Sequence, residues 1–166
     1  MNNNPAGTVR TVSPGRISTL VYAALSLLAI AAAATAKGYA DTLAEFVFVV
    51  LVSAAGLVVA HLWSAVLARR LIDPASLTRA RLSHEAVTSS TMALPGVLMA
   101  VVAWLSHLVS GRIETSVTVA MGVLVVVLFA YTWAGTTRGA SRLSGLLWAL
   151  GTAGVGALMI VFKVLV

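Results

Sequence analysis

The feature that most constrains the fold is an uninterrupted apolar run over residues 46–68, which ends at the charged pair Arg69 and Arg70. The one ionisable side chain inside this run is His61. The hydrocarbon core of a bilayer is about 30 Å thick, and an α-helix crosses it with roughly 20 apolar residues. Because the run is long enough for that crossing, we predict that it spans a membrane as a helix.

Four further apolar runs predict spans at about 17–36, 86–109, 115–134 and 143–162. The composition agrees with this count, since 60% of the 166 residues are hydrophobic and 10% are charged. A soluble domain carries about 25% charged residues. We therefore predict an all-α transmembrane bundle of five spans over residues 17–166, after a disordered cytoplasmic tail at residues 1–16.

The basic residues predict which side of the membrane each connection occupies, because cytoplasmic loops carry an excess of Lys and Arg. With the N-terminus inside, the inner segments hold Arg10, Arg16, Arg69, Arg70, Arg79, Arg81, Arg138 and Arg142. The outer segments hold only Lys37, Arg112 and Lys163. This distribution predicts a cytoplasmic N-terminus and an external C-terminus in a bacterial plasma membrane. The lipid bilayer is the expected partner of the Arg69, Arg70, Arg79 and Arg81 group, through lipid phosphates. We expect no nucleic-acid partner despite the net charge of +6.

The first span has an alternative interpretation as a cleaved signal peptide. Ala34-Thr35-Ala36 has the form of a cleavage site, and the preceding tail is basic. The apolar run is longer than the roughly 7–15 residues of a signal-peptide core. An uncleaved span is therefore the prediction that we follow.

Two proline sites predict local changes of structure. Asp73-Pro74 has the pattern of an N-cap followed by proline, which predicts a short helix that ends at Leu82. Pro95, within the third span, removes a backbone donor and predicts a kink. The Thr88-Ser89-Ser90-Thr91 run before it supplies hydroxyls for the freed backbone groups. Ser110-Gly111 predicts a tight turn between the third and fourth spans.

Polar side chains inside or beside the spans are the candidates for function. His61 is one, because an ionisable residue within a membrane is often functional. Ser90 and Thr91 should lie at similar depth if the second and third spans form an antiparallel hairpin. His61 then either hydrogen-bonds a hydroxyl in a structural role or takes part in proton transfer.

Glu85 is the other candidate, at the start of the third span. It either pairs with Arg69, Arg70 or Arg81 in a surface network or belongs to a longer functional face of its helix. Helical spacing puts it on one face with Ser89, Met92, Gly96, Met99 and Ala103. That face has the pattern of a packing surface or of a solute path.

Small residues predict where helices approach each other, since lipid provides no hydrophobic drive for their association. The fifth span carries such a row at four-residue spacing, formed by Gly145, Ala149, Ala153 and Ala157. The row serves either packing within the chain or contact with a second copy or another membrane protein.

Several classes of chemistry lack their residues in this sequence. There is no cysteine, so disulfides and thiol catalysis are excluded. The histidines are not spaced as metal ligands, and no phosphate-binding or nucleophile motif is present. We therefore predict no enzymatic activity, no metal and no cofactor.

Three features together resemble a family of small multi-pass actinobacterial integral membrane proteins. The first is Ala60-His61 with Trp63, and the second is the stretch from Glu85 to Leu94-Pro95. The third is a glycine-rich last span that closes with Phe162-Lys163-Val164-Leu165. The resemblance implies a helical membrane fold and no particular activity.

Two functions remain open from the sequence. The first is a non-enzymatic accessory or self-assembling membrane protein, which the scarcity of polar residues within the spans favours. The second is a small transporter or channel that is linked to protons through His61, since histidine is a common proton-transfer residue. A solute path needs more polarity at the membrane midplane than the spans contain.

Overall fold

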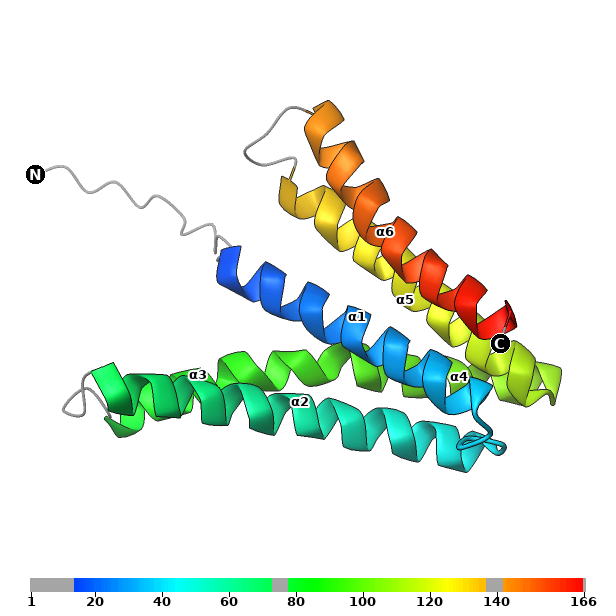
Figure 1. The fold of residues 1–166 in the computed structure, drawn as a ribbon, viewed down its shortest axis with the longest axis horizontal. Coiled ribbons are helices and arrows are strands. Elements are labelled where there is room, and N and C mark those ends of the chain that lie inside the picture. Colours follow the sequence, from blue (N-terminus) through cyan, green and yellow to red (C-terminus); the bar gives the residue numbers. More distant parts are fainter. Residues whose placement is uncertain (1–13, 73–77, 137–141, 166) are drawn as a thin grey trace, which may run out of the picture.

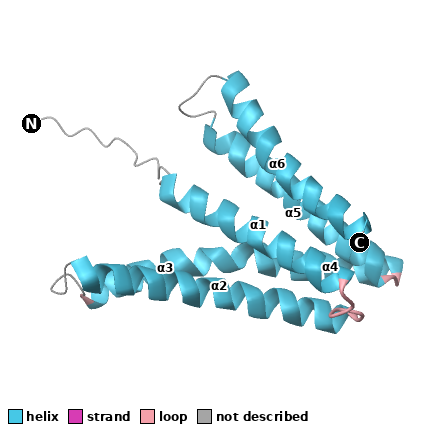
Figure 2. Ribbon diagram, in the orientation of Figure 1, coloured by secondary structure: helices cyan, strands magenta, loops and turns pink. Residues whose placement is uncertain are grey.

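The computed structural model describes residues 14–72, 78–136 and 142–165. The described residues form helices joined by short turns, with no strand among them (Figure 2). The elements are α1 (Pro14–Ala36), α2 (Leu43–Ile72), α3 (Arg79–Ser90), the 3-10 turn η2 (Thr91–Ala93), α4 (Leu94–Ser110), α5 (Ile113–Thr136) and α6 (Arg142–Leu165).

Five segments of these helices are long and apolar enough to cross a membrane. They are Ser18–Ala36, Leu43–Ala68, Leu82–Ser110, Ile113–Ala134 and Leu143–Val161. The third of them runs through α3, η2 and α4. The predicted fold class, an all-α bundle of five spans, is confirmed, and it supports a multi-pass membrane protein.

Two helix boundaries differ from the sequence prediction. α1 begins at Pro14, inside the segment that we predicted to be a disordered tail, while residues 1–13 lie outside the described part. The predicted helix start at Asp73-Pro74 also lies outside it. α3 begins at Arg79 and continues past Leu82 as far as Ser90, because no proline or glycine interrupts it there.

The helices form two antiparallel hairpins with α1 between them (Figure 1). One hairpin pairs α2 with α3 and α4, and the other pairs α5 with α6. The hairpins meet at the turn from α4 to α5 and diverge toward the opposite end, where α2 and α5 finish. α1 contacts both hairpins, including α2 and α6.

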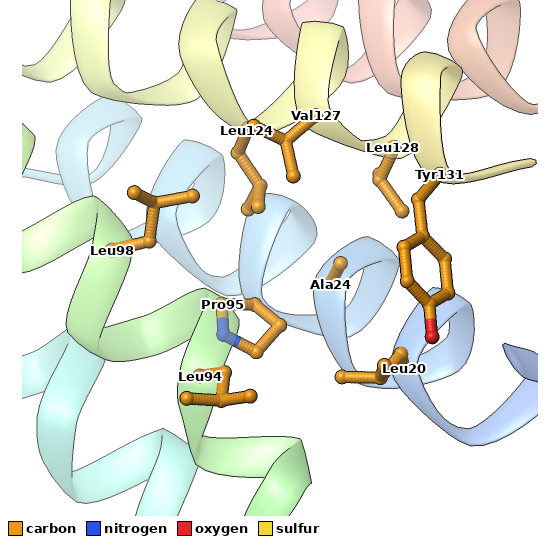
Figure 3. A pocket seen from close by; sticks show the side chains of 9 residues that line it. All are labelled: Leu20, Ala24, Leu94, Pro95, Leu98, Leu124, Val127, Leu128 and Tyr131. Atoms are coloured by element: carbon orange, nitrogen blue, oxygen red, sulfur yellow. The ribbon is translucent and has the colours of Figure 1, made fainter. Parts of the chain in front are cut away.

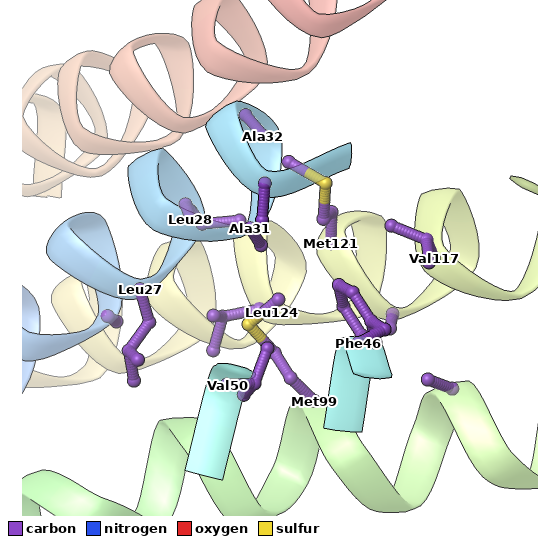
Figure 4. Packing of buried hydrophobic residues seen from close by; sticks show 14 of the residues in the cluster. Leu27, Leu28, Ala31, Ala32, Phe46, Val50, Met99, Val117, Met121 and Leu124 are labelled. Atoms are coloured by element: carbon purple, nitrogen blue, oxygen red, sulfur yellow. The ribbon is translucent and has the colours of Figure 1, made fainter. Parts of the chain in front are cut away.

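The core lies where α1 meets α2, α4 and α5 (Figure 4). Its largest fully buried side chains include Leu27 and Leu28 of α1, Phe46 of α2, Met99 of α4 and Met121 of α5. Close packing of such side chains supplies dispersion contacts that do not depend on water. The core therefore suits a bundle that associates within lipid.

The outer surface of the helices carries large apolar side chains. Trp63, Trp104 and Trp148 are each more than half exposed, as are many of the valines and leucines around them. Soluble proteins rarely expose continuous apolar patches of this extent. Hydrocarbon is the environment that such a surface fits.

The turns at one end of the bundle use left-handed glycines. Gly111 has φ of 64° and ends α4, and its N–H donates to the carbonyl of His107 at 2.8 Å. The predicted turn at Ser110-Gly111 is confirmed. Gly38, with φ of 68°, has the corresponding role after α1.

Candidate functional site

A close contact between α2 and α4 fixes the register of the first hairpin. A Cβ atom added to Gly96 would lie 2.6 Å from the Cβ of Ala54 and 3.5 Å from the carbonyl oxygen of Val50. Only glycine allows the two helices to approach this closely. The helices are antiparallel, so the same direction from this contact runs forward along α2 and backward along α4 and α3. Seven residues, or about two helical turns, lead to His61 on α2 and to Ser89 on α3.

Counted from this contact, Ser89 lies at about the level of His61. Its side chain is fully buried, and its hydroxyl has no hydrogen-bond partner within the described part of the chain. His61 itself is half-buried. The sequence had pointed instead to the next two hydroxyls, on the last residue of α3 and the first residue of η2.

Those hydroxyls, on Ser90 and Thr91, donate to their own helix. Ser90 Oγ donates to the carbonyl of Val87 at 2.8 Å, and Thr91 Oγ1 donates to that of Thr88 at 2.6 Å. Ser90 is also exposed, while Thr91 is half-buried. The sequence placed Ser89 on the face of Glu85 but did not pair it with His61, because their relative level depends on the contact of Gly96 with Ala54.

The break before Pro95 shows how the helix adapts to the missing donor. Pro95 cannot donate to the carbonyl of Thr91, and the N–H of Leu94 donates to it instead. This bond closes the 3-10 turn η2 and interrupts the regular helix between Ser90 and Leu94. The sequence predicted a kink at Pro95, and the structure shows a short 3-10 turn just before it.

The face that begins with Glu85 is buried over most of its length. Ser89, Met92, Gly96, Met99 and Ala103 are all buried, and Glu85 is half-buried at its end. The side chains of Arg69 and Arg81, two of its predicted partners, lie outside the described set, and Arg70 is exposed. Dense packing along the face favours a packing surface over a solute path.

The predicted small-residue row of α6 becomes more exposed from its first residue to its last. Gly145 and Ala149 are buried, Ala153 is half-buried and Ala157 is exposed. α6 also packs tightly at Gly156, where an added Cβ would lie 2.9 Å from Cγ2 of Val125.

A different set of small residues lies on the opposite side of α6. Gly151 and Gly154 are exposed, and nothing lies within 4 Å of a Cβ added to either. At 100° per residue they are on the far side from Gly145, Ala149 and Gly156. α6 therefore has one small-residue face inside the bundle and another outside it.

An N-terminal cap of α2 was not recognised from the sequence, although its pattern is present there. The N–H of Glu45 donates to Thr42 Oγ1 at 3.2 Å, and the Glu45 carboxylate accepts from the N–H of Thr42 at 3.0 Å. The same carboxylate accepts from the N–H of Asp41 at 3.0 Å. This is a capping box, whose signature is Thr-x-x-Glu.

Neither a cluster of metal ligands in the described residues nor a match to a known protein gives further information about the site. Among the residues that the structure describes, no three His, Asp or Glu side chains gather closely enough to hold an ion. No family model, curated protein or solved structure matches this chain. The actinobacterial resemblance stays a prediction.

Proposed function

We propose that this protein is a non-enzymatic membrane protein that assembles with a second copy of itself through the outward face of α6. The observation that carries the proposal is the pair Gly151 and Gly154, which leaves the α6 backbone open on the side that faces away from the bundle. Small residues at such positions let two membrane helices approach closely, and the resulting contacts drive association in lipid.

The surroundings of these glycines suit a helix–helix contact. Leu147 and Leu158 lie along the same side, and both are exposed. A shallow, open groove runs between the side chains of the first half of the helix, from Leu143 to Gly151. Large side chains beside a shallow groove form the knobs and the hole that interlocking helices need.

Self-association can be measured by energy transfer between labelled copies in liposomes at decreasing protein-to-lipid ratios. We expect Gly151→Leu combined with Gly154→Leu to reduce dimer formation by about tenfold, a loss of about 1.4 kcal/mol. Gly122→Leu on α5 is the matched control, because a Cβ at Gly122 also meets nothing within 4 Å. Equal association of the double variant and the wild-type chain would contradict the proposal.

Transport is the second candidate, and the buried Ser89 hydroxyl level with His61 is the observation that favours it. A membrane protein that moves protons keeps ionisable and hydroxyl groups within its bundle. The same liposomes can report proton or cation flux with a pH-sensitive dye. Flux that His61→Ala abolishes in folded protein would replace assembly with transport as the function.

A further inference from the structure

The hydroxyl of Ser89 differs from those of its neighbours in the sequence. Thr88, Ser90 and Thr91 each donate to a carbonyl of their own span, at 3.0, 2.8 and 2.6 Å. A serine or threonine in a membrane helix commonly satisfies its hydroxyl in this way. Ser89 Oγ is buried and has no hydrogen-bond partner within the described part of the chain. Its hydroxyl is therefore available to a group outside its own helix.

The burial of Ser89 determines where such a group must be. A hydroxyl that is buried without a partner costs free energy, because it loses its hydrogen bonds to water and gains none in return. Buried polar groups are accordingly paired with protein or with ordered water in nearly all structures. Ser89 is 0% exposed, so its partner must be enclosed within the bundle.

α2 covers the side of α3 that carries Ser89. Among the described elements outside its own span, α3 packs mainly against α2. The contact of Gly96 with Ala54 marks the facing sides of this hairpin, and a step of seven residues returns to within about 20° of the same side. That step leads to Ser89 and to His61. The turn η2 adds some rotation before Ser89, but the complete burial of Ser89 shows that it still faces inward.

The surroundings of Ser89 and His61 fit a water molecule. Leu57 and Val58, one turn before His61, are half-buried, and Met92, one turn after Ser89, is 1% exposed. A buried water makes two to four hydrogen bonds. The hydroxyl and the imidazole supply two, and helix carbonyls have a second lone pair for others. A metal ion fits less well, because no three metal-ligating side chains gather among the described residues.

We propose that one water molecule is bound between α2 and α3, where it bridges the hydroxyl of Ser89 and the imidazole of His61. The bridge links the two helices by hydrogen bonds inside an otherwise apolar contact. It also brings His61 into contact with water from within the bundle. The inference rests on neither assembly nor transport, because it concerns what is bound at this contact and uses no residue of α6.

The sign of the stability change in Ser89→Ala tests the bridge. Removing an unpaired buried hydroxyl stabilises a protein, whereas removing one that holds a water destabilises it. In mixed micelles we expect Ser89→Ala to raise the unfolding equilibrium constant about fivefold, and to have no effect in a chain that also carries His61→Phe. Ser90→Ala is the matched control, because the exposed Ser90 hydroxyl bonds its own helix. Its effect should be the same with and without His61→Phe.

The water itself can be detected by solid-state NMR of protein in liposomes with ¹⁵N-labelled histidine. Magnetisation transferred from water protons to the His61 ring nitrogens reports their contact, and the loss of a signal in His61→Phe identifies which signal belongs to His61. We expect this transfer to fall severalfold in Ser89→Ala and to remain unchanged in Ser90→Ala.

Three results would overturn the proposal. Stabilisation by Ser89→Ala would show that the hydroxyl has no partner. Equal effects of Ser89→Ala with His61 and with Phe at that position would show that the two side chains are not linked. Energetic linkage without transfer from water would indicate a direct hydrogen bond in place of the bridge. Circular dichroism verifies that each variant keeps its helical fold.

Discussion

Gly96 shows how a single missing side chain determines the distance between two helices. A methyl group there would collide with the Cβ of Ala54, which is itself attached directly to the α2 backbone and cannot rotate away. The sequence placed Gly96 on the right face of its span, beside Met92 and Met99. It did not identify Ala54 as the partner, because the two residues are brought together only by the register of the hairpin.

Replacing this glycine should separate the helices. We expect Gly96→Ala to lower the free energy of unfolding by about 1–3 kcal/mol, since overpacking a tight contact forces the backbones apart. Denaturation in mixed micelles, followed by circular dichroism, measures the change. Gly122→Ala is the control and should be neutral or stabilising by up to about 1 kcal/mol, because alanine favours helix and the site is open. Similar losses in both variants would refute the role of the contact.

At the scale of the element, the span positions were predictable because they depend on local composition. An apolar run long enough to cross lipid must satisfy its own backbone hydrogen bonds, and a helix does this without any partner. The division of α6 into two small-residue faces was not predictable. Gly145, Gly151 and Gly156 look alike in the sequence, and only the position of α5 and α1 determines which of them face inward.

The start of α2 provides a test at this scale. Thr42→Ala removes the acceptor of the Glu45 N–H, and we expect it to destabilise the first turn by about 1 kcal/mol. Faster hydrogen exchange of the amides at residues 43–46 would report the loss. Thr152→Ala is the control, because the Thr152 hydroxyl bonds a carbonyl within α6 at 3.0 Å and caps no helix end. Unchanged exchange at the start of α2 would show that the capping box contributes nothing there.

At the scale of the whole molecule, the helix ends that precede or follow arginine-rich segments all lie at the end of the bundle where the hairpins diverge. α1 and α6 begin there, and α2 and α5 finish there (Figure 1). Because successive spans cross the membrane in opposite directions, the sequence was sufficient to predict which helix ends lie on the same side. An apolar cavity lies between α1, α4 and α5 (Figure 3). It could not be predicted from the sequence, because it depends on the angle between the two hairpins, and no local pattern encodes that angle.

The orientation of the bundle in the membrane is a prediction that the absence of cysteine makes simple to test. We expect Lys37→Cys, in the turn between α1 and α2, to react with an impermeant maleimide added to intact cells. Arg70→Cys, near the end of α2, should react only after the cells are opened. Both positions are exposed, and the unmodified chain gives no background. The reverse pattern of labelling would invert the predicted topology.

The position of α1 has a consequence for how the chain is made. Of the described helices, α1 comes first in the chain, yet its neighbours in the bundle include α6, which comes last among them. Its final docking must therefore wait until α6 has been made. Until α6 is made, α1 lacks part of its packing partners. During that time it is accessible to the insertion machinery and to the proteases that remove unassembled membrane segments.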